Sequence, residues 1–295
     1  PVLVVLSFPK LLLQASGNFQ DEALKIHSFN IAESKFTSLI WPILTSVVIS
    51  RLAEDYTLVG IYDILLKQPN IEVNNKSVRV FESFEELLNT KVDIVVEIAG
   101  VGAVRELVIP LLQSGKHVVI TSVGALADAE LLAEITDTAK RTGCKVHVTS
   151  GAVGGFDILS TVSLMGNAVT AIESTKAPKS LNGAPYLEGK ELPSDRRVIA
   201  FEGSAGDAIA GFPKNTNVAV ATGIAGGGVD TVSVRVVSDP TAQGNTHRIT
   251  IENDSARAVV EVTSKPDFKN PKSSVTAAWS VAGLLKNLVN PIQLF

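Results

Sequence analysis

Several residue types that would point to particular classes of protein are scarce in this chain. Among its 295 residues there is one cysteine, so no disulfide can form within the chain, and we expect a cytoplasmic protein. That residue, Cys144, begins a predicted buried strand, which favours an inert core thiol. The four histidines include no pair at the spacing of metal ligands. We therefore predict no metal site.

An excess of basic charge and a long hydrophobic run are also missing. The net charge of -4 provides no basic face for nucleic acid or for an anionic membrane. The apolar residues 1–13 are interrupted by Pro9 and Lys10, and the run is shorter than the ~20 residues of a membrane span. Because the run also lacks a basic start, an extra strand or a loosely packed extension is favoured over a secretory signal.

Strand and helix patterns alternate regularly between residues 56 and 149. We expect strands at 56–62, 92–98, 116–121 and 145–149, with helices at 84–90, 104–113 and 128–142. Such alternation predicts an α/β fold built on a doubly wound parallel sheet of the Rossmann type. Ligands of these sheets lie beyond the carboxyl ends of the strands.

Small or polar residues follow several of these strands at their carboxyl ends, the edge of the sheet where a ligand is expected and which we call the ligand edge. They are Asp63, Ala99, Ser122 and the run from 150 to 155. An acidic residue after the second strand typically binds the adenosine ribose of a dinucleotide, and its charge repels a 2′-phosphate. We therefore predict that Asp63 favours NAD, although NADP is not excluded.

Glycine is missing where a dinucleotide-binding fold most needs it. Residues 24–26 are typical of a first strand, after which a glycine-rich turn should bind the pyrophosphate. No glycine occurs between Asn18 and Val59, and a helix is plausible only over 45–53, after Trp41 and Pro42. Another loop could bind the phosphates, the segment could bind none, or the recorded sequence could differ here from the ancestral gene.

The second half of the chain has a different pattern. A small-residue helix is expected at 218–225, strands at 169–175, 232–237, 247–252 and 258–264, and a final helix at 273–287. Short turns link the last strands, which predicts a largely antiparallel sheet in a second, α+β domain. Its apolar face would be exposed in a monomer, so we expect a homodimer. The expected division is an extension (1–23), a dinucleotide-binding domain (24–150), a catalytic and dimerisation domain (151–268) and a C-terminal segment (269–295).

Three patches carry a resemblance to a known family: SGAVGGFD at 150–157, FPKNTNVA at 212–219 and NTHRI at 245–249. Together they resemble the L-aspartate dehydrogenase family, whose members oxidise L-aspartate to iminoaspartate with NAD or NADP and supply NAD biosynthesis. The resemblance implies that His247 is catalytic, that Asn217 and Ala152 contact the cofactor, and that the closing helix returns to the first domain.

Oxidation of an amino acid requires that the nitrogen lose a proton, which a neutral imidazole can accept. A substrate with two carboxylates also needs cations, and Lys176, Lys214, Arg248 and Lys272 are candidates, although each is more typical of a solvated surface charge. Two alternatives remain open: a related reductase of the homoserine dehydrogenase or dihydrodipicolinate reductase type, and a catalytically inactive binding homologue without the glycine turn.

Overall fold

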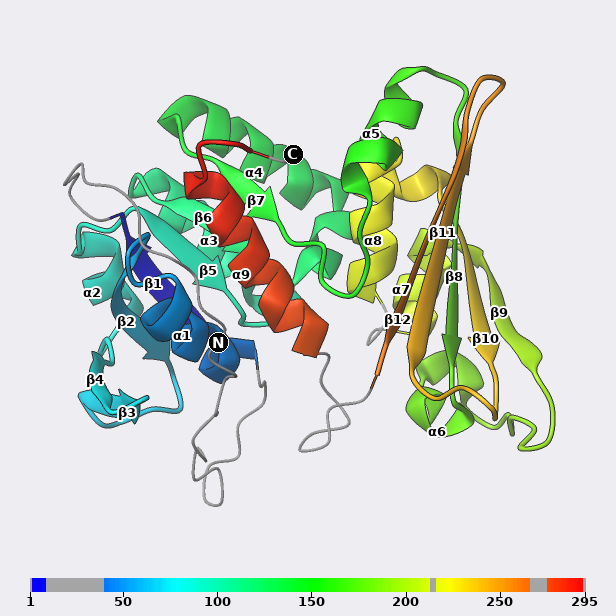
Figure 1. Ribbon diagram of the computed structural model, residues 1–295, viewed down its shortest axis with the longest axis horizontal. Helices are drawn as coiled ribbons and strands as arrows, with labels where there is room; N and C mark the ends of the chain where they lie inside the picture. The colour runs from blue at the N-terminus through cyan, green and yellow to red at the C-terminus, as the bar shows by residue number, and fades with distance from the viewer. Residues whose placement is uncertain (1, 9–39, 213–215, 266–274, 294–295) are drawn as a thin grey trace.

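The computed structural model describes residues 2–8, 40–212, 216–265 and 275–293. Two five-stranded sheets lie side by side, each with its own covering helices (Figure 1). Within these ranges no helix is both long and apolar enough to cross a lipid bilayer. The predicted strand at 24–26 lies outside the described residues.

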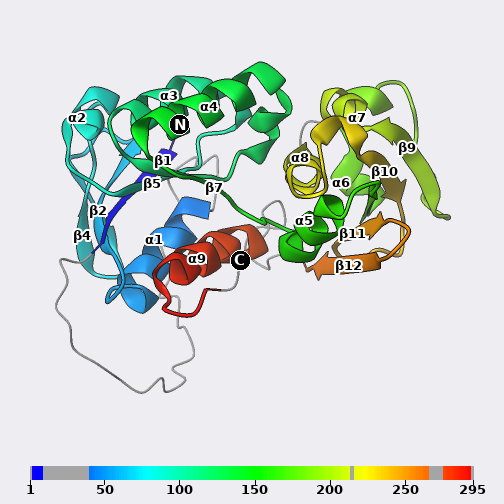
Figure 2. The same cartoon turned by 90° about the horizontal axis from the view of Figure 1, so that it is seen from above.

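The first sheet has the order β2-β1-β5-β6-β7. Its strands are β1 (Val2–Ser7), β2 (Thr57–Asp63), β5 (Ile94–Glu97), β6 (His117–Ile120) and β7 (Val146–Val148), and a hairpin of β3 (Asn70–Val73) and β4 (Lys76–Arg79) lies beside it. Helices α3 (Val104–Gln113) and α4 (Ala129–Thr142) cover one face, and α1 (Ile40–Arg51) and α9 (Val275–Val289) cover the other (Figure 2). The Rossmann-type architecture predicted from the sequence is confirmed.

Local sequence explains where the covering helices begin and end. Asp128 caps α4 by accepting a hydrogen bond from the Leu131 N–H, and Gly143 ends the helix in a left-handed conformation. Ser83 caps α2 (Phe84–Asn89), and its hydroxyl accepts a hydrogen bond from the Glu86 N–H at 3.1 Å.

Strand β1, which lies between β2 and β5, departs from the expected parallel arrangement. The N-terminal run favoured as an extra strand does form one, β1, but it pairs antiparallel to both β2 and β5. Val4, Val5 and Leu6 are fully buried, so both faces of β1 contribute to the core. Burial on both faces explains the continuous apolar run, whereas the direction of the strand depends on partners distant in sequence.

The second sheet has the order β12-β11-β8-β10-β9 and is largely antiparallel, with one parallel pair between β8 and β10. Its strands are β8 (Val169–Lys176), β9 (Val198–Ser204), β10 (Ser233–Ser238), β11 (Asn245–Glu252) and β12 (Arg257–Ser264). Side chains of α5 (Phe156–Leu164), α7 (Ala205–Gly211) and α8 (Thr216–Ala225) pack on one face of this sheet. The short α6 (Pro178–Leu181) lies in the long polar segment that precedes β9.

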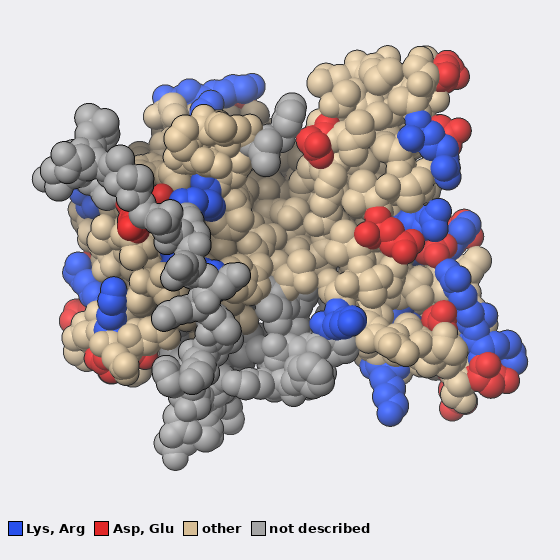
Figure 3. Space-filling model, viewed as in Figure 1, with Lys and Arg blue, Asp and Glu red and all other residues tan. Residues whose placement is uncertain are grey.

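The opposite face of the second sheet is not the apolar surface that the sequence suggested. Glu173 of β8 forms ion pairs with Arg197 and Arg235, and Arg235 also pairs with Glu202 of β9. Side chains of both charges gather along this side of the molecule (Figure 3). Alternation along the strands places these charges outward while the apolar partners face the helices. The sheet also exposes apolar side chains of β8, β9 and β12, so its outward surface is mixed rather than wholly apolar, and the expected dimer stays a prediction.

Candidate functional site

Three strands of the first sheet end at one edge, and predicted cofactor-contacting residues follow them there. Asp63 is the last residue of β2, Ala99 follows β5, and Ser122 follows β6. Asp63 is only 5% exposed, and its Oδ1 accepts a hydrogen bond from the Leu65 N–H at 2.9 Å. One oxygen of this carboxylate therefore stabilises the turn after β2.

A buried carboxylate that the sequence analysis missed connects the loops at this edge. Glu97, the last residue of β5, accepts hydrogen bonds from the N–H groups of Ser122 (3.0 Å), Ala99 (2.6 Å) and Gly100 (3.1 Å), and from the Ser122 hydroxyl (2.8 Å). Burial raises the pKa of Glu97, and the hydrogen bonds from Ser122, Ala99 and Gly100 oppose that rise. Ser122 Oγ also accepts from the Gly100 N–H at 3.0 Å, so Glu97 holds the loops after β5 and β6 together.

The backbone at Gly100 is open to a ligand. Gly100 has φ of 100°, a conformation that side chains disfavour, and a Cβ there would meet no atom within 4 Å. The glycine thus provides a backbone that a flat molecule can approach at the edge where dinucleotides bind.

The centre of this edge differs from the usual dinucleotide-binding arrangement. Because β1 is antiparallel, its first residues Val2 and Leu3 lie beside Asp63 and Glu97. Helix α1 leads through residues 52–56 into the start of β2, so its N-terminus points toward the edge where β2 ends. That helix begins earlier than expected, at Ile40, and includes Pro42, which its first turn tolerates.

The small-residue junction between the sheets contacts the C-terminal helix. The Gly151 N–H donates a hydrogen bond to Ser280 Oγ of α9 at 3.1 Å, and Ala152 follows in the same turn, half-buried. Helix α9 packs on α1 through a core that includes Val281 and Leu285. The junction therefore lies where the first sheet, α9 and the second sheet meet.

Asn217 connects the helices of the second sheet to the first sheet. It lies in the first turn of α8, where its Oδ1 accepts from the Gly124 N–H at 2.8 Å and its Nδ2 donates to the Thr121 carbonyl at 3.3 Å. Both partners flank Ser122. This side chain thus fixes the start of α8 against the ligand edge.

His247 lies on the face of the second sheet that the helices cover. It is 3% exposed, and its Nδ1 lies 2.8 Å from Oγ of Ser174, its cross-strand partner on β8. Burial, and secondarily the charge of Lys176, lowers the pKa of His247 to about 3. The imidazole is therefore neutral at pH 7, as a proton acceptor must be.

Helix α8 runs alongside β8, and its direction shows how His247 lies with respect to the ligand edge. The helix ends over the start of β8, where Thr170 Oγ1 donates to the Gly226 carbonyl at 3.0 Å. Its N-terminus, with Asn217, accordingly points toward the other end of β8, where Ser174 pairs with His247 (Figure 1). The structure thus joins Asn217 to residues on either side of Ser122 and orients the same helix toward the end of β8 that pairs with His247.

The candidate cations differ in their surroundings. Lys176, the last residue of β8, is half-buried, and burial lowers its pKa to about 8, so the expectation of a solvated surface charge is wrong for this residue. Arg248 is exposed and lies 3.5 Å from Glu261 in an ion pair on the outward face. Lys214 and Lys272 lie outside the described residues.

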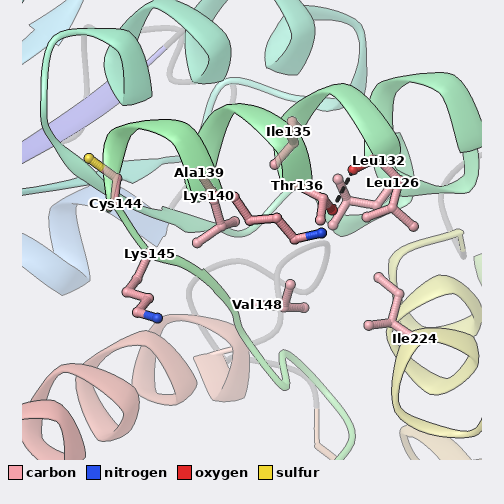
Figure 4. Close-up of a pocket in the computed structure, with 12 residues that line it drawn as sticks. Leu126, Leu132, Ile135, Thr136, Ala139, Lys140, Cys144, Lys145, Val148 and Ile224 are labelled. Atoms are coloured by element: carbon pink, nitrogen blue, oxygen red, sulfur yellow. Dashed lines mark hydrogen bonds between the residues drawn. The ribbon is translucent and has the colours of Figure 1, made fainter.

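One cavity of about 390 Å³ lies away from all of these residues. It is lined mainly by apolar side chains of α4 and β7 and by Ile224 of α8, and one threonine and two lysines also border it (Figure 4). The buried Cys144 borders it, with Sγ 3.6 Å from the Leu112 carbonyl. Because polar groups that could orient a reacting molecule concentrate elsewhere, the loops around Glu97 and the end of β8 are the better candidate site.

Sequence reasoning missed Glu97 and Ser174 and undervalued Lys176. The sequence did contain a signal for Glu97, which is a charged residue within the predicted buried strand VDIVVEI. A buried carboxylate needs several hydrogen-bond donors around it, so its presence there indicates a polar network. For Ser174 and Lys176 the signal was their spacing. They lie two and four residues after the buried Ile172 in one strand, so all three side chains lie on the same face of the sheet.

Both halves of the chain are similar in sequence to known dehydrogenases. Residues 157–288 match the family described as "Aspartate dehydrogenase, C-terminal", and residues 45–149 match "Homoserine dehydrogenase, NAD binding domain". The L-aspartate dehydrogenase of Methanosarcina mazei is 39% identical over 217 residues, which cover 72% of this chain and 80% of that protein. The L-aspartate dehydrogenase of Methanococcus maripaludis is 32% identical over 255 residues, 85% of this chain and 94% of that protein.

A solved structure agrees with these relatives. The crystal structure of aspartate dehydrogenase from Thermotoga maritima superposes with a TM-score of 0.64 at 28% identity, covering 79% of this chain and 88% of that one. Similarity of sequence and of fold over most of the chain thus points to one group of enzymes. The chain belongs to the L-aspartate dehydrogenase family.

Proposed function

We propose that this chain oxidises L-aspartate to iminoaspartate with a pyridine nucleotide, and that the imine then hydrolyses to oxaloacetate and ammonia. The Asn217 contacts carry the proposal, because they join α8 to the loop around Ser122 at the ligand edge. The same helix packs on the sheet that bears His247. A substrate held at that edge would face a neutral imidazole from the second sheet.

In this proposal His247 accepts the proton that the substrate nitrogen loses. Ser174 holds Nδ1, which leaves Nε2 for the substrate. A pKa of about 3 describes the ring before substrate binds. The negative charge of a bound dicarboxylate would raise this pKa, so the ring becomes a stronger acceptor when substrate is present. When bound, the nicotinamide supplies the acceptor for the hydride that leaves Cα.

The residues at the ligand edge fit the nicotinamide end and the adenosine ribose of a pyridine nucleotide. Open backbone at Gly100 supports assigning Ala99, Ser122, Ala152 and Asn217 to the nicotinamide end. Asp63 suits the adenosine ribose, and because its charge would repel a 2′-phosphate we propose NAD as the preferred cofactor. The pyrophosphate finds no glycine-rich turn between residues 18 and 59, and the N-terminus of α1 is the group that we propose in its place.

An assay of reduced nicotinamide with two substrates tests the activity. We expect NAD-dependent turnover of L-aspartate and little with L-homoserine. Turnover of L-homoserine alone would contradict the proposal and favour a homoserine dehydrogenase, the protein named in the description that matches residues 45–149.

The second candidate is a binding homologue without catalysis. It is favoured by Val2 and Leu3 at the centre of the ligand edge, where a glycine-rich turn is usual. Calorimetric titration with NAD separates the two candidates. Saturable heat is expected for the dehydrogenase, whereas the absence of heat and of any thermal shift at millimolar NAD would support the inactive homologue.

We also propose a cytoplasmic homodimer, with the division of the chain at residues 150 and 268 that the sequence suggests. Apolar side chains that remain exposed, among them Val169, Ile199 and Val259, support a protein contact. Light scattering on the purified chain measures the oligomeric state, and a monomer at all concentrations would contradict this part of the proposal.

A further inference from the structure

Four polar residues share one end of the covered face of the second sheet. Ser174 and Lys176 alternate on β8, Ser174 pairs with His247 across β11, and Lys176 pairs with Ser238 across β10. Towards the other end of the same face these strands carry Ile172, Val234 and Ile249, which belong to the hydrophobic core. Burying polar residues at the end of an otherwise apolar face lowers stability unless they have polar partners.

Ser238 supplies the observation that points to a ligand. Its side chain is fully buried, and among the described residues its Oγ has no hydrogen-bond partner. An unsatisfied buried hydroxyl is costly and uncommon in native proteins. A valine at this position, like Val236 two residues earlier, would fill the face without that cost.

Lys176 places a cation next to this hydroxyl. Its pairing with Ser238 is in regular parallel register, so both side chains lie on the same face. Burial disfavours the ammonium form of Lys176, and a bound anion would compensate for it. Because His247 is neutral, the four polar residues together carry at most one positive charge, which matches one carboxylate better than a doubly charged phosphate.

We propose that Lys176 and Ser238 bind the side-chain carboxylate of the substrate, so that they determine the preference for a dicarboxylic amino acid. Lys176 donates from its ammonium group and Ser238 from its hydroxyl, while His247, one strand away, faces the reacting end. This inference rests on the proposed oxidation of L-aspartate, which it deepens by naming the substrate contacts.

Calorimetry with succinate, a dicarboxylate that cannot be oxidised at an amine, tests the inference without depending on turnover. Titrations are made with and without NAD on the full chain. We expect Lys176→Met to weaken succinate binding about 10- to 100-fold and Ser238→Ala about three- to tenfold. Lys179→Met removes an exposed lysine three residues further on and should leave binding unchanged. Lys176→Arg should restore part of the affinity.

The outcomes separate this inference from the proposed function. If the wild-type chain binds succinate and Lys176→Met weakens that binding, but the wild type does not oxidise L-aspartate, the contacts stand and the function fails. If Lys176→Met binds succinate as tightly as the wild type, or if the wild type binds none, the inference is overturned. Should Lys176→Met fail to fold by circular dichroism, unchanged binding in Ser238→Ala overturns it instead. In an active chain, Lys176→Met should also lower the preference for L-aspartate over L-asparagine in kcat/KM about tenfold or more.

Discussion

The proposed chemistry depends on a few side chains whose charges are controlled by burial. His247 is neutral because its ring is buried and Lys176 lies near it, and Glu97 is buried among donors from three residues. Such perturbed groups are common at functional sites, although they also occur in purely structural networks. Their ionisation can be measured without any assay of activity.

The first prediction concerns acid stability. Because the pKa of His247 is about 3 in the fold and about 6.5 in an unfolded chain, protonation favours unfolding as the pH falls below about 6.5 and until it approaches 3. His247→Asn should remove this contribution, on the order of 2 kcal/mol between pH 7 and pH 5. Urea unfolding at a series of pH values measures it.

Ser174→Ala is the matched control, because it keeps the buried imidazole. It should retain the steeper loss of stability in acid. An identical pH dependence in His247→Asn and the wild type would show that the imidazole is not held neutral by the fold.

The second prediction concerns Glu97. In Glu97→Gln one acceptor oxygen becomes an amide NH₂ that must face a backbone N–H, because donors surround both carboxylate oxygens. We expect a loss of about 1–3 kcal/mol in the free energy of unfolding and weaker NAD binding. Glu72→Gln, at an exposed position of β3, should change neither quantity. Unchanged unfolding of Glu97→Gln would argue against its role in joining the loops.

At the scale of elements, the ligand edge depends on the loop after β5. Gly100→Ala forces a side chain into φ of 100°, so we expect a loss of about 1–3 kcal/mol in stability. Gly102→Ala is a close control, since an added Cβ there also meets no atom within 4 Å and φ is not positive. Equal thermal unfolding of the two variants would contradict the importance of this conformation.

Elements with strong local signals could be predicted from the sequence, and those that depend on distant partners could not. Helix α3 has the expected bounds, and α4 begins one residue after the start expected at Asp128 and ends at Thr142 as expected. The direction of β1 had no local signal, because a strand buried on both faces has the same apolar composition in either direction. Lys176 was underestimated for a similar reason, since its cross-strand neighbour Ser238 lies on β10, which is distant in sequence.

In the molecule as a whole, hydrogen bonds of Asn217 join α8, which packs on the second sheet, to the loop after β6 of the first sheet. The sequence predicted an α/β sheet, a largely antiparallel second sheet and the family. It could not predict that the N-terminal strand lies between β2 and β5 and runs antiparallel to both. This arrangement replaces the residues that usually approach the pyrophosphate, so cofactor affinity is the property in which this chain should differ most from its relatives.

The central claim is that a neutral imidazole on the second sheet acts on a substrate held at the ligand edge of the first. Comparison of wild type and His247→Ala tests it most directly, with turnover of L-aspartate and NAD affinity measured on the same preparations. We expect kcat to fall by about 100-fold or more, with nearly unchanged NAD affinity. Undiminished kcat in His247→Ala would contradict it.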